Sequence, residues 1–230
     1  MAPLLLLPGL SSTPELWDQV RATLPIGIVS HPLENPALED IDAIAAEILR
    51  TAPPRFALAG FSFGGYVALA IAAQAGDRIE RLALISTGSG ADSPEAAAGR
   101  ARFIDLAQSG GYESIDAKMT KFLLHPDRQE DTAIQATRER MSRDYGAARY
   151  VAHQRACIGR PARNDTLASI RVPTLIAVGR EDRVTPLAQH EEMARRVPAS
   201  DLVVFERCGH LAPLEAPEAL GKALAQWMTH

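Results

Sequence analysis

The stretch Gly60-Phe61-Ser62-Phe63-Gly64-Gly65 decides the fold. The apolar run Phe56–Ala59 before it predicts a buried strand, and the alanine-rich run Tyr66–Ala73 after it predicts a buried helix. A G-x-S-x-G sequence between a strand and a helix is typical of a sharp turn that exposes its serine at the carboxyl edge of a sheet. Crowding around such a turn leaves no room for side chains at the outer glycines. We therefore predict that Ser62 is a nucleophile; the alternative is a glycine-rich turn without chemistry.

A serine hydroxyl is a weak nucleophile near neutral pH, so a base must take its proton. Six histidines are available, and His210 lies just past the predicted strand Leu202–Phe205. Functional groups of parallel α/β sheets gather at the carboxyl ends of the strands. The other histidines lie in predicted helical segments, before a proline or at the end of the sequence. We predict His210 as the base.

The base needs a carboxylate that fixes its tautomer and stabilises the imidazolium. Glu181 and Asp182 both follow the predicted strand Thr174–Gly179. Successive side chains of an extended segment point in opposite directions, so at most one of them faces His210. Aspartate loses less rotamer freedom, and the order Ser62, Asp182, His210 is one that such triads use. We predict Asp182 as the acid; the alternatives are Glu181, or an aspartate that only caps the turn.

Around these residues the chain alternates between short apolar runs and helical patterns. Runs that are bounded by Gly or Pro and apolar nearly throughout indicate strands buried on both faces of a parallel sheet. Strands that alternate with helices indicate an α/β fold. The predicted strands are Leu4–Leu7, Ile26–Ser30, Phe56–Gly60, Arg81–Ser86, Thr174–Gly179 and Leu202–Phe205. The further predicted helices are Pro14–Thr23, Asp40–Arg50, Pro186–Val197 and Pro217–Met228.

One segment breaks this alternation, because residues 93–169 are helical and polar and contain no clear strand. We expect a helical cap there, with residues 1–92 and 170–230 as the core; the alternative is a run of solvated helices. Between Arg100 and Arg171, 13 Lys and Arg stand against 9 Asp and Glu, whereas the whole chain has a net charge of -4. This excess predicts an entrance biased toward anionic substrates, or else a solvated face. The arginines in question include Arg138, Arg140, Arg143, Arg149 and Arg155.

The composition excludes several classes of protein. A chain of 230 residues with 47% hydrophobic and 23% charged residues builds a sizeable core and is not disordered. Its acidic net charge offers no basic footprint for nucleic acid, and no apolar run reaches the roughly 18 residues of a membrane span. The run Leu4–Leu7 lacks the preceding positive charge of a signal peptide. We expect a cytoplasmic protein with no nucleic-acid or membrane partner.

The cysteines, the histidine spacing and the glycine motifs of the sequence do not predict a metal site or a bound cofactor. Two cysteines, Cys157 and Cys208, do not make a disulfide framework or a zinc site by themselves. No two histidines are spaced i, i+4, and no phosphate-binding or dinucleotide-binding glycine motif is present. We expect Cys208 to be a small buried thiol rather than a redox switch.

Several motifs together resemble the α/β-hydrolase superfamily. They are Pro8-Gly9-Leu10, the stretch 60–65, Val172-Pro173-Thr174, Gly179-Arg180-Glu181-Asp182-Arg183-Val184-Thr185-Pro186, Gly209-His210-Leu211 and Glu215-Ala216-Pro217-Glu218. The similarity covers nearly the whole chain, and the insertion resembles the helical cap of small bacterial members. It implies an α/β-hydrolase fold whose mostly parallel sheet has helices on both faces. The first two strands of larger relatives have no counterpart, so six strands are expected.

The resemblance also implies an oxyanion hole formed by the backbone N–H groups of Leu10 and Phe63. Many relatives carry His-Gly where this chain has Pro8-Gly9, but backbone donors survive that change. Relatives that use an aspartate nucleophile are disfavoured, because Ser62 stands in its place.

We therefore expect a cofactor-independent serine hydrolase that cleaves a small carboxylic ester or related acyl compound. Ser62, His210 and Asp182 would act through an acyl-enzyme. The family also includes lactonases, thioesterases, amidases and C–C bond hydrolases, so a lyase, a lactonase or a C–C bond hydrolase with the same triad is an alternative. A second alternative is a ligand-binding receptor that keeps the fold with little turnover.

Overall fold

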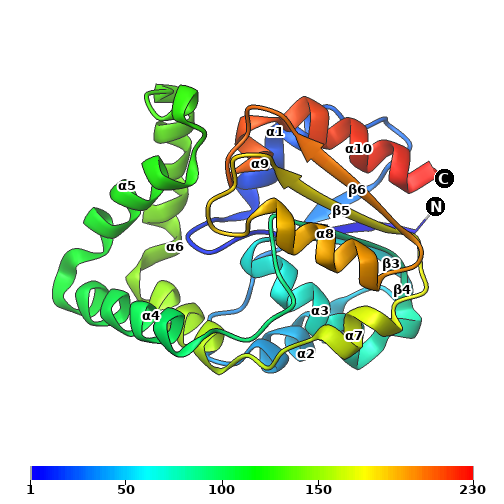
Figure 1. Ribbon diagram of the computed structural model, residues 1–230, viewed down its shortest axis with the longest axis horizontal. Coiled ribbons are helices and arrows are strands. Elements are labelled where there is room, and N and C mark those ends of the chain that lie inside the picture. Colours follow the sequence, from blue (N-terminus) through cyan, green and yellow to red (C-terminus); the bar gives the residue numbers. More distant parts are fainter. Residues whose placement is uncertain (1, 230) are drawn as a thin grey trace.

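The computed structural model describes residues 2–229, in which strands and helices alternate along the chain (Figure 1). The strands are β1 (Leu4–Leu7), β2 (Ser30–Pro32), β3 (Phe56–Phe61), β4 (Ile79–Ile85), β5 (Thr174–Gly179) and β6 (Ser200–Phe205). The helices are α1 (Asp18–Ala22), α2 (Ile41–Thr51), α3 (Phe63–Ala75), α4 (Pro94–Leu106), α5 (Tyr112–Leu123), α6 (Thr132–Gly159), α7 (Asn164–Ser169), α8 (Leu187–Arg196), α9 (Ala212–Glu215) and α10 (Pro217–Thr229).

The six strands form one sheet in the order β2-β1-β3-β4-β5-β6, and every neighbouring pair is parallel. The predicted six-stranded α/β fold is therefore confirmed. The chain builds outward from β1 in one direction to β2 and in the other from β3 to β6. The loops that follow β1 and β3 diverge at this switch point, which is where open α/β sheets bind their ligands.

Helices cover both faces of the sheet, as predicted. Side chains alternate along a strand, so Leu4 and Leu6 of β1 join one apolar cluster while Leu5 and Leu7 join the other. The first cluster packs against α1, α9 and α10, and the second packs against α2, α3 and α8 (Figure 1). The sheet is thus held rigidly from both sides, with its carboxyl edge left for the functional groups.

The strand predicted at Ile26–Ser30 is wrong. The N–H of Ile28 donates to the carbonyl of Pro25 at 2.9 Å and closes a turn there, and Ile26 is fully exposed at 105%. The strand follows this turn as β2, at the edge of the sheet. An apolar pattern next to Pro and Gly does not distinguish a turn from a short strand. Burial on both faces also fails at the edge strands β2 and β6, which are largely half-buried, whereas β1, β3 and β5 are buried throughout.

The helical segment between β4 and β5 stands beside the carboxyl edge of the sheet (Figure 1). Helices α4, α5 and α6 share an apolar cluster of their own, which includes Ile104, Tyr112, Ile115 and Tyr150. Helix α6 bends at Gly146, whose φ of 76° favours glycine. Helix α7 packs instead against α3 and α8. The predicted cap boundary at residue 169 therefore lies past the three helices that stand over the site.

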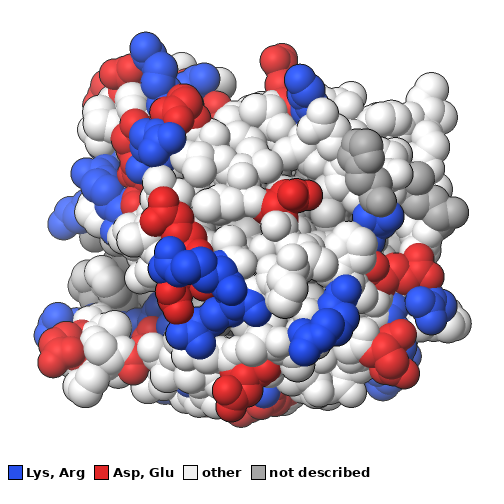
Figure 2. Space-filling model, turned by 45° about the vertical axis from the view of Figure 1, so that its right-hand side comes forward, with Lys and Arg blue, Asp and Glu red and all other residues white. Residues whose placement is uncertain are grey.

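The five cap arginines singled out in the sequence are all paired, so these side chains do not themselves leave free positive charge at the entrance. Each contacts a carboxylate, in the pairs Arg138–Asp116, Arg140–Glu15, Arg143–Glu139, Arg149–Glu34 and Arg155–Glu39. Basic and acidic side chains also lie next to one another around the rim of the face in Figure 2.

Within residues 2–229, no helix combines the length and the apolar character needed to cross a membrane.

Candidate active site

Ser62 sits on the turn between β3 and α3 with φ 52° and ψ -113°. A non-glycine residue rarely adopts a positive φ, so the surroundings must hold this conformation in place. The N–H of Ser62 donates to the carbonyl of Ile85 at 2.9 Å, and its carbonyl accepts from the hydroxyl of Thr87 at 2.8 Å. Ile85 ends β4 and Thr87 lies in the loop just after it, so the neighbouring strand and its loop fix the strained serine.

The two outer glycines of the motif are required by close backbone approach. A Cβ atom on Gly60 would overlap the backbone of Gly64, and a Cβ on Gly64 would overlap the carbonyl of Leu7. The predicted crowding of strand and helix at this turn is therefore confirmed. It also brings the end of β1 against the start of α3.

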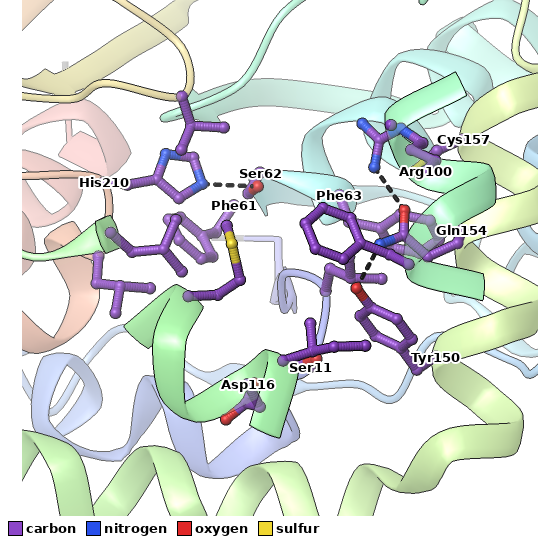
Figure 3. Close-up of a pocket in the computed structure, with 18 of the residues that line it drawn as sticks. Ser11, Phe61, Ser62, Phe63, Arg100, Asp116, Tyr150, Gln154, Cys157 and His210 are labelled. Atoms are coloured by element: carbon purple, nitrogen blue, oxygen red, sulfur yellow. Dashed lines mark hydrogen bonds between the residues drawn. The ribbon is translucent and has the colours of Figure 1, made fainter. Parts of the chain in front are cut away.

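The structure brings together the three side chains predicted as nucleophile, base and acid. Nε2 of His210 lies 2.9 Å from Oγ of Ser62, and Nδ1 of His210 lies 2.8 Å from Oδ2 of Asp182 (Figure 3 shows the first contact). His210 and Asp182 are buried, at 3% and 4% exposure. They enter from the loops after β6 and β5, so three strand ends supply the three groups.

Asp182 also caps its own turn, so the two readings of this residue in the sequence are compatible. Its Oδ1 accepts the N–H groups of Val184 and Thr185 at 2.8 and 2.9 Å, and its Oδ2 accepts the hydroxyl of Thr185. Burial disfavours the charged carboxylate, but His210 and these hydrogen bonds outweigh it and lower the pKa of Asp182 to about 2. Glu181 turns away and accepts the N–H of Cys208 at 3.0 Å.

The backbone N–H groups predicted for the oxyanion hole belong to residues on the same cavity wall. Leu10 and Phe63 line the cavity that contains Ser62 and His210. Their N–H groups make no hydrogen bond within the part of the chain that the structure describes. Helix α3 begins at Phe63, and the first N–H groups of a helix carry partial positive charge. Both donors are therefore free to receive a negatively charged oxygen.

Arg138 of α6 holds the loop that carries Leu10. Its guanidinium is 2% exposed, and it donates to the carbonyl of Ser11 at 2.8 Å and the hydroxyl of Ser12 at 2.9 Å. Its other nitrogen pairs with Asp116 of α5 at 2.8 Å. Ser11 has φ 52°, so the cap braces a strained residue directly after Leu10.

The cavity has a volume of about 250 Å³ and lies between the sheet edge and the three cap helices. Drug-sized ligands occupy about 300–1,000 Å³, so this cavity suits a smaller molecule. Much of its wall is apolar and includes Phe61, Phe63, Phe103, Ile115 and Met119. Figure 3 shows Ser62 and His210 on one side of the Phe63 ring, and Arg100, Gln154 and Tyr150 on the other.

Comparison with known proteins shows to which family the chain belongs. The sequence profile described as "Alpha/beta hydrolase family" matches residues 4–223. The chain belongs to the alpha/beta hydrolase family. This hydrolase is 28% identical, over 94% of its length and 91% of the relative, to the pimeloyl-[acyl-carrier protein] methyl ester esterase of Nitrosomonas europaea.

One further relative and one solved structure are also similar to this chain. The hydrolase is 29% identical to the 2-hydroxymuconate semialdehyde hydrolase of Pseudomonas putida, over 74% of this chain and 61% of that relative. A thermophilic esterase from Thermogutta terrifontis superposes on it with a TM-score of 0.88 and 27% identity, covering the whole of this chain and 90% of the other. The predicted family and the predicted hydrolase class of enzyme are therefore confirmed.

One residue that positions the base of this hydrolase was not predicted from the sequence. Glu215 is buried, and its carboxylate accepts the N–H groups of Gly209 and Leu211 at 3.1 and 3.0 Å, on either side of His210. It also accepts the N–H of His125 at 2.7 Å. A lone acid in the apolar run that follows His210 is the signal that points to it, since a buried carboxylate needs donors.

A second histidine of the hydrolase lies close to the site without touching Ser62. His153 of α6 stacks on Phe63 with ring centroids 4.5 Å apart. Its Nε2 lies 2.7 Å from the carbonyl of Pro36, which only accepts, so Nε2 carries the proton and Nδ1 accepts from the hydroxyl of Tyr145. This arrangement requires a neutral ring, and burial lowers the pKa of His153 to about 4.

The stability of the hydrolase is expected to fall between pH 6.5 and 4 because of His153. The unfolded chain takes up this proton near pH 6.5, whereas the folded ring resists it down to about pH 4. Protonation therefore favours the unfolded state as the pH drops, by up to about 3 kcal/mol. Chemical denaturation at pH 7 and pH 4.5 measures this difference. His153→Phe should flatten it, while the exposed His31→Gln should keep it; equal slopes in both variants would contradict the assignment.

Proposed function

We propose that this hydrolase cleaves small carboxylic esters through an acyl-enzyme on Ser62, with His210 as the base and Asp182 as the orienting acid. One observation carries the proposal. A continuous hydrogen-bonded chain runs from Oγ of Ser62 through His210 to Asp182, and it opens on a cavity with two unbonded backbone N–H groups. A nucleophile, a base, an oriented acid and an oxyanion receiver are what acyl transfer requires.

The reaction follows from this placement. Oγ of Ser62 attacks the ester carbonyl while Nε2 of His210 takes its proton, and Asp182 stabilises the resulting imidazolium. The N–H groups of Leu10 and Phe63 receive the oxyanion of the tetrahedral intermediate. His210 then gives its proton to the departing alcohol, leaving the acyl group on Ser62. Water repeats the sequence, with His210 as its base, and releases the acid and the free serine. Loss of one oxyanion donor typically costs about 10²–10³ in kcat.

The names of similar proteins support ester cleavage, and they leave C–C bond hydrolysis as an alternative. Both the Nitrosomonas relative and the Thermogutta structure are named as esterases. The Pseudomonas relative is named as a 2-hydroxymuconate semialdehyde hydrolase, and C–C hydrolases are among the homologues. We place C–C bond hydrolysis, and with it lactone opening, second. Cleavage by the proposed residues needs no bound cofactor.

A substrate series with product analysis separates these activities. We expect p-nitrophenyl esters to be turned over with a burst of p-nitrophenol close to the enzyme concentration, because acylation precedes hydrolysis of the acyl-enzyme. Rates should fall along a series from acetate to decanoate, since the cavity is small. Matched thioesters, amides, lactones and a vinylogous 1,5-diketone test the alternatives. Turnover of the diketone without any ester turnover would replace the proposal, and binding without turnover of any compound would indicate a receptor.

A further inference from the structure

The charges on the cavity wall do not cancel. The Asp, Glu, Lys and Arg side chains among its described lining residues are Arg100, Asp116 and Arg138. Asp116 and Arg138 neutralise each other at 2.8 Å. Arg100 of α4 remains, and its partner Asp92, 2.6 Å away, does not line the cavity.

Asp92 does not neutralise Arg100 fully, because it serves two arginines. The same carboxylate lies 2.6 Å from Arg160, and Asp92 and Arg160 are both largely buried. Two guanidinium groups and one carboxylate leave one positive charge at this end of the cavity. The Arg100 side chain is 22% exposed, so solvent screens its charge only in part, and this end of the cavity favours an anion.

At the same end of the cavity, the hydrogen bonds between side chains leave a donor, and no acceptor, without a partner among residues 2–229. Arg100 donates to Oε1 of Gln154 at 2.8 Å, and a guanidinium only donates, so the orientation of the amide is fixed. The amide nitrogen of Gln154 then donates to the hydroxyl oxygen of Tyr150 at 2.7 Å. The proton of Tyr150 has no acceptor within residues 2–229, and burial raises the pKa of Tyr150 to about 12, so the proton stays in place near neutral pH.

We propose that Arg100 and Tyr150 form a carboxylate-binding subsite, so that the preferred substrates are esters with a carboxylate remote from the scissile bond. The ester part rests on the proposed function; the anion subsite stands on its own contacts. A carboxylate is an acceptor-only group, and it supplies both the missing negative charge and the missing acceptor. Arg100 and Tyr150 are specificity residues in this scheme and take no part in bond cleavage.

The position of the subsite determines the form of the substrate. Arg100, Gln154 and Tyr150 lie across the cavity from Ser62 and His210 (Figure 3). The wall between them is largely apolar. The substrate therefore needs an apolar spacer between its ester and its carboxylate, as in a half-ester of a short dicarboxylic acid.

Paired esters of equal length test this subsite. The p-nitrophenyl half-ester of adipic acid carries the carboxylate, and p-nitrophenyl hexanoate lacks it. Arg100→Met should lower kcat/KM for the half-ester by about 10–100-fold, and for hexanoate by less than about threefold. The loss should lie mainly in KM, because the contact is far from the reacting carbonyl. Asp92 keeps Arg160 as its partner in this variant. An acetate ester of 4-hydroxybutanoate tests a carboxylate on the alcohol side.

Two more variants make the kinetic result decisive. Tyr150→Phe removes one hydroxyl and should lower kcat/KM for the half-ester by about three- to tenfold, which keeps a readout if Arg100→Met fails to fold. Arg155→Met, which breaks only a partly exposed pair with Glu39, should change neither ester. Equal losses on both esters in Arg100→Met and Tyr150→Phe would show a structural role and overturn the proposal.

A binding measurement separates this inference from the proposed ester cleavage. Calorimetry measures ligand binding to Ser62→Ala, which cannot turn the ligand over. This variant should bind monomethyl adipate detectably and methyl hexanoate at least about tenfold more weakly, because methyl hexanoate lacks the charge-assisted contact. Adding Arg100→Met should remove the difference. If the difference persists without Arg100, the subsite is wrong even when esters are cleaved. If the difference depends on Arg100 and no ester is turned over, the subsite stands and the proposed function fails.

Discussion

Ser62→Ala is expected to lower kcat by about 10⁴–10⁶ while the protein stays folded. The hydroxyl that is lost is the group of Ser62 that hydrogen-bonds to His210, at 2.9 Å. The backbone of the turn is held by its own hydrogen bonds to Ile85 and Thr87. A smaller residue fits the same space. Steady-state kinetics on the best p-nitrophenyl ester, with a thermal melt of both proteins, measure the effect.

Covalent labelling supplies an independent readout for the same residue. A fluorophosphonate probe should modify Ser62 in the parent protein and leave Ser62→Ala unlabelled. The exposed Ser109, on the cap, is the matched control, because Ser109→Ala should keep both labelling and turnover. Full labelling of Ser62→Ala, or its unchanged turnover, would remove Ser62 from the mechanism.

Asp182→Asn is expected to lower kcat by roughly 10³–10⁴ with little change in melting temperature. The amide oxygen still accepts the N–H groups of Val184 and Thr185, so the turn keeps its cap. The amide nitrogen, however, replaces Oδ2 and faces Nδ1 of His210, which then has to accept. The ring proton moves to Nε2, and His210 in that tautomer does not take the proton of Ser62.

The neighbouring carboxylate provides the matched comparison. Glu181→Gln should stay within about tenfold of the parent in kcat, because its contact is the N–H of Cys208 and an amide oxygen still accepts it. Kinetics of the two variants on one ester decide between them. If Glu181→Gln shows the large loss and Asp182→Asn does not, the acid is Glu181. If neither loses activity, the acid comes from another strand end.

The parts of the site that the sequence predicted are those determined by local sterics and chain order. The motif around Ser62 has to lie where a strand meets a helix, because its glycines admit no side chain there. Asp182 and His210 then follow from the rule that parallel strands end at one edge. The family resemblance added Leu10 and Phe63, whose roles stay predictions.

Features that depend on packing between distant segments were not predictable in this way. The pairing of Arg138 with Asp116, 22 residues away, depends on how α5 and α6 pack. The charge excess of the cap therefore suggested a basic entrance, although Arg100 alone remains uncompensated on the cavity wall. The wrongly predicted strand at Ile26–Ser30 has a local cause, since a proline turn and a short edge strand share the same composition.

The grip of Arg138 on the loop after β1 has a consequence for protein engineering. Caps of related enzymes are natural units to exchange when a new substrate range is wanted. In this chain the exchanged piece would take with it the donor that holds Ser11 and Ser12, and the loop next to Leu10 would lose its brace. A chimera would therefore lose turnover along with selectivity, unless the grafted helices bring a matching guanidinium. Helix α6 both lines the substrate cavity and holds the loop beside Leu10, so substrate binding and turnover have to be redesigned together.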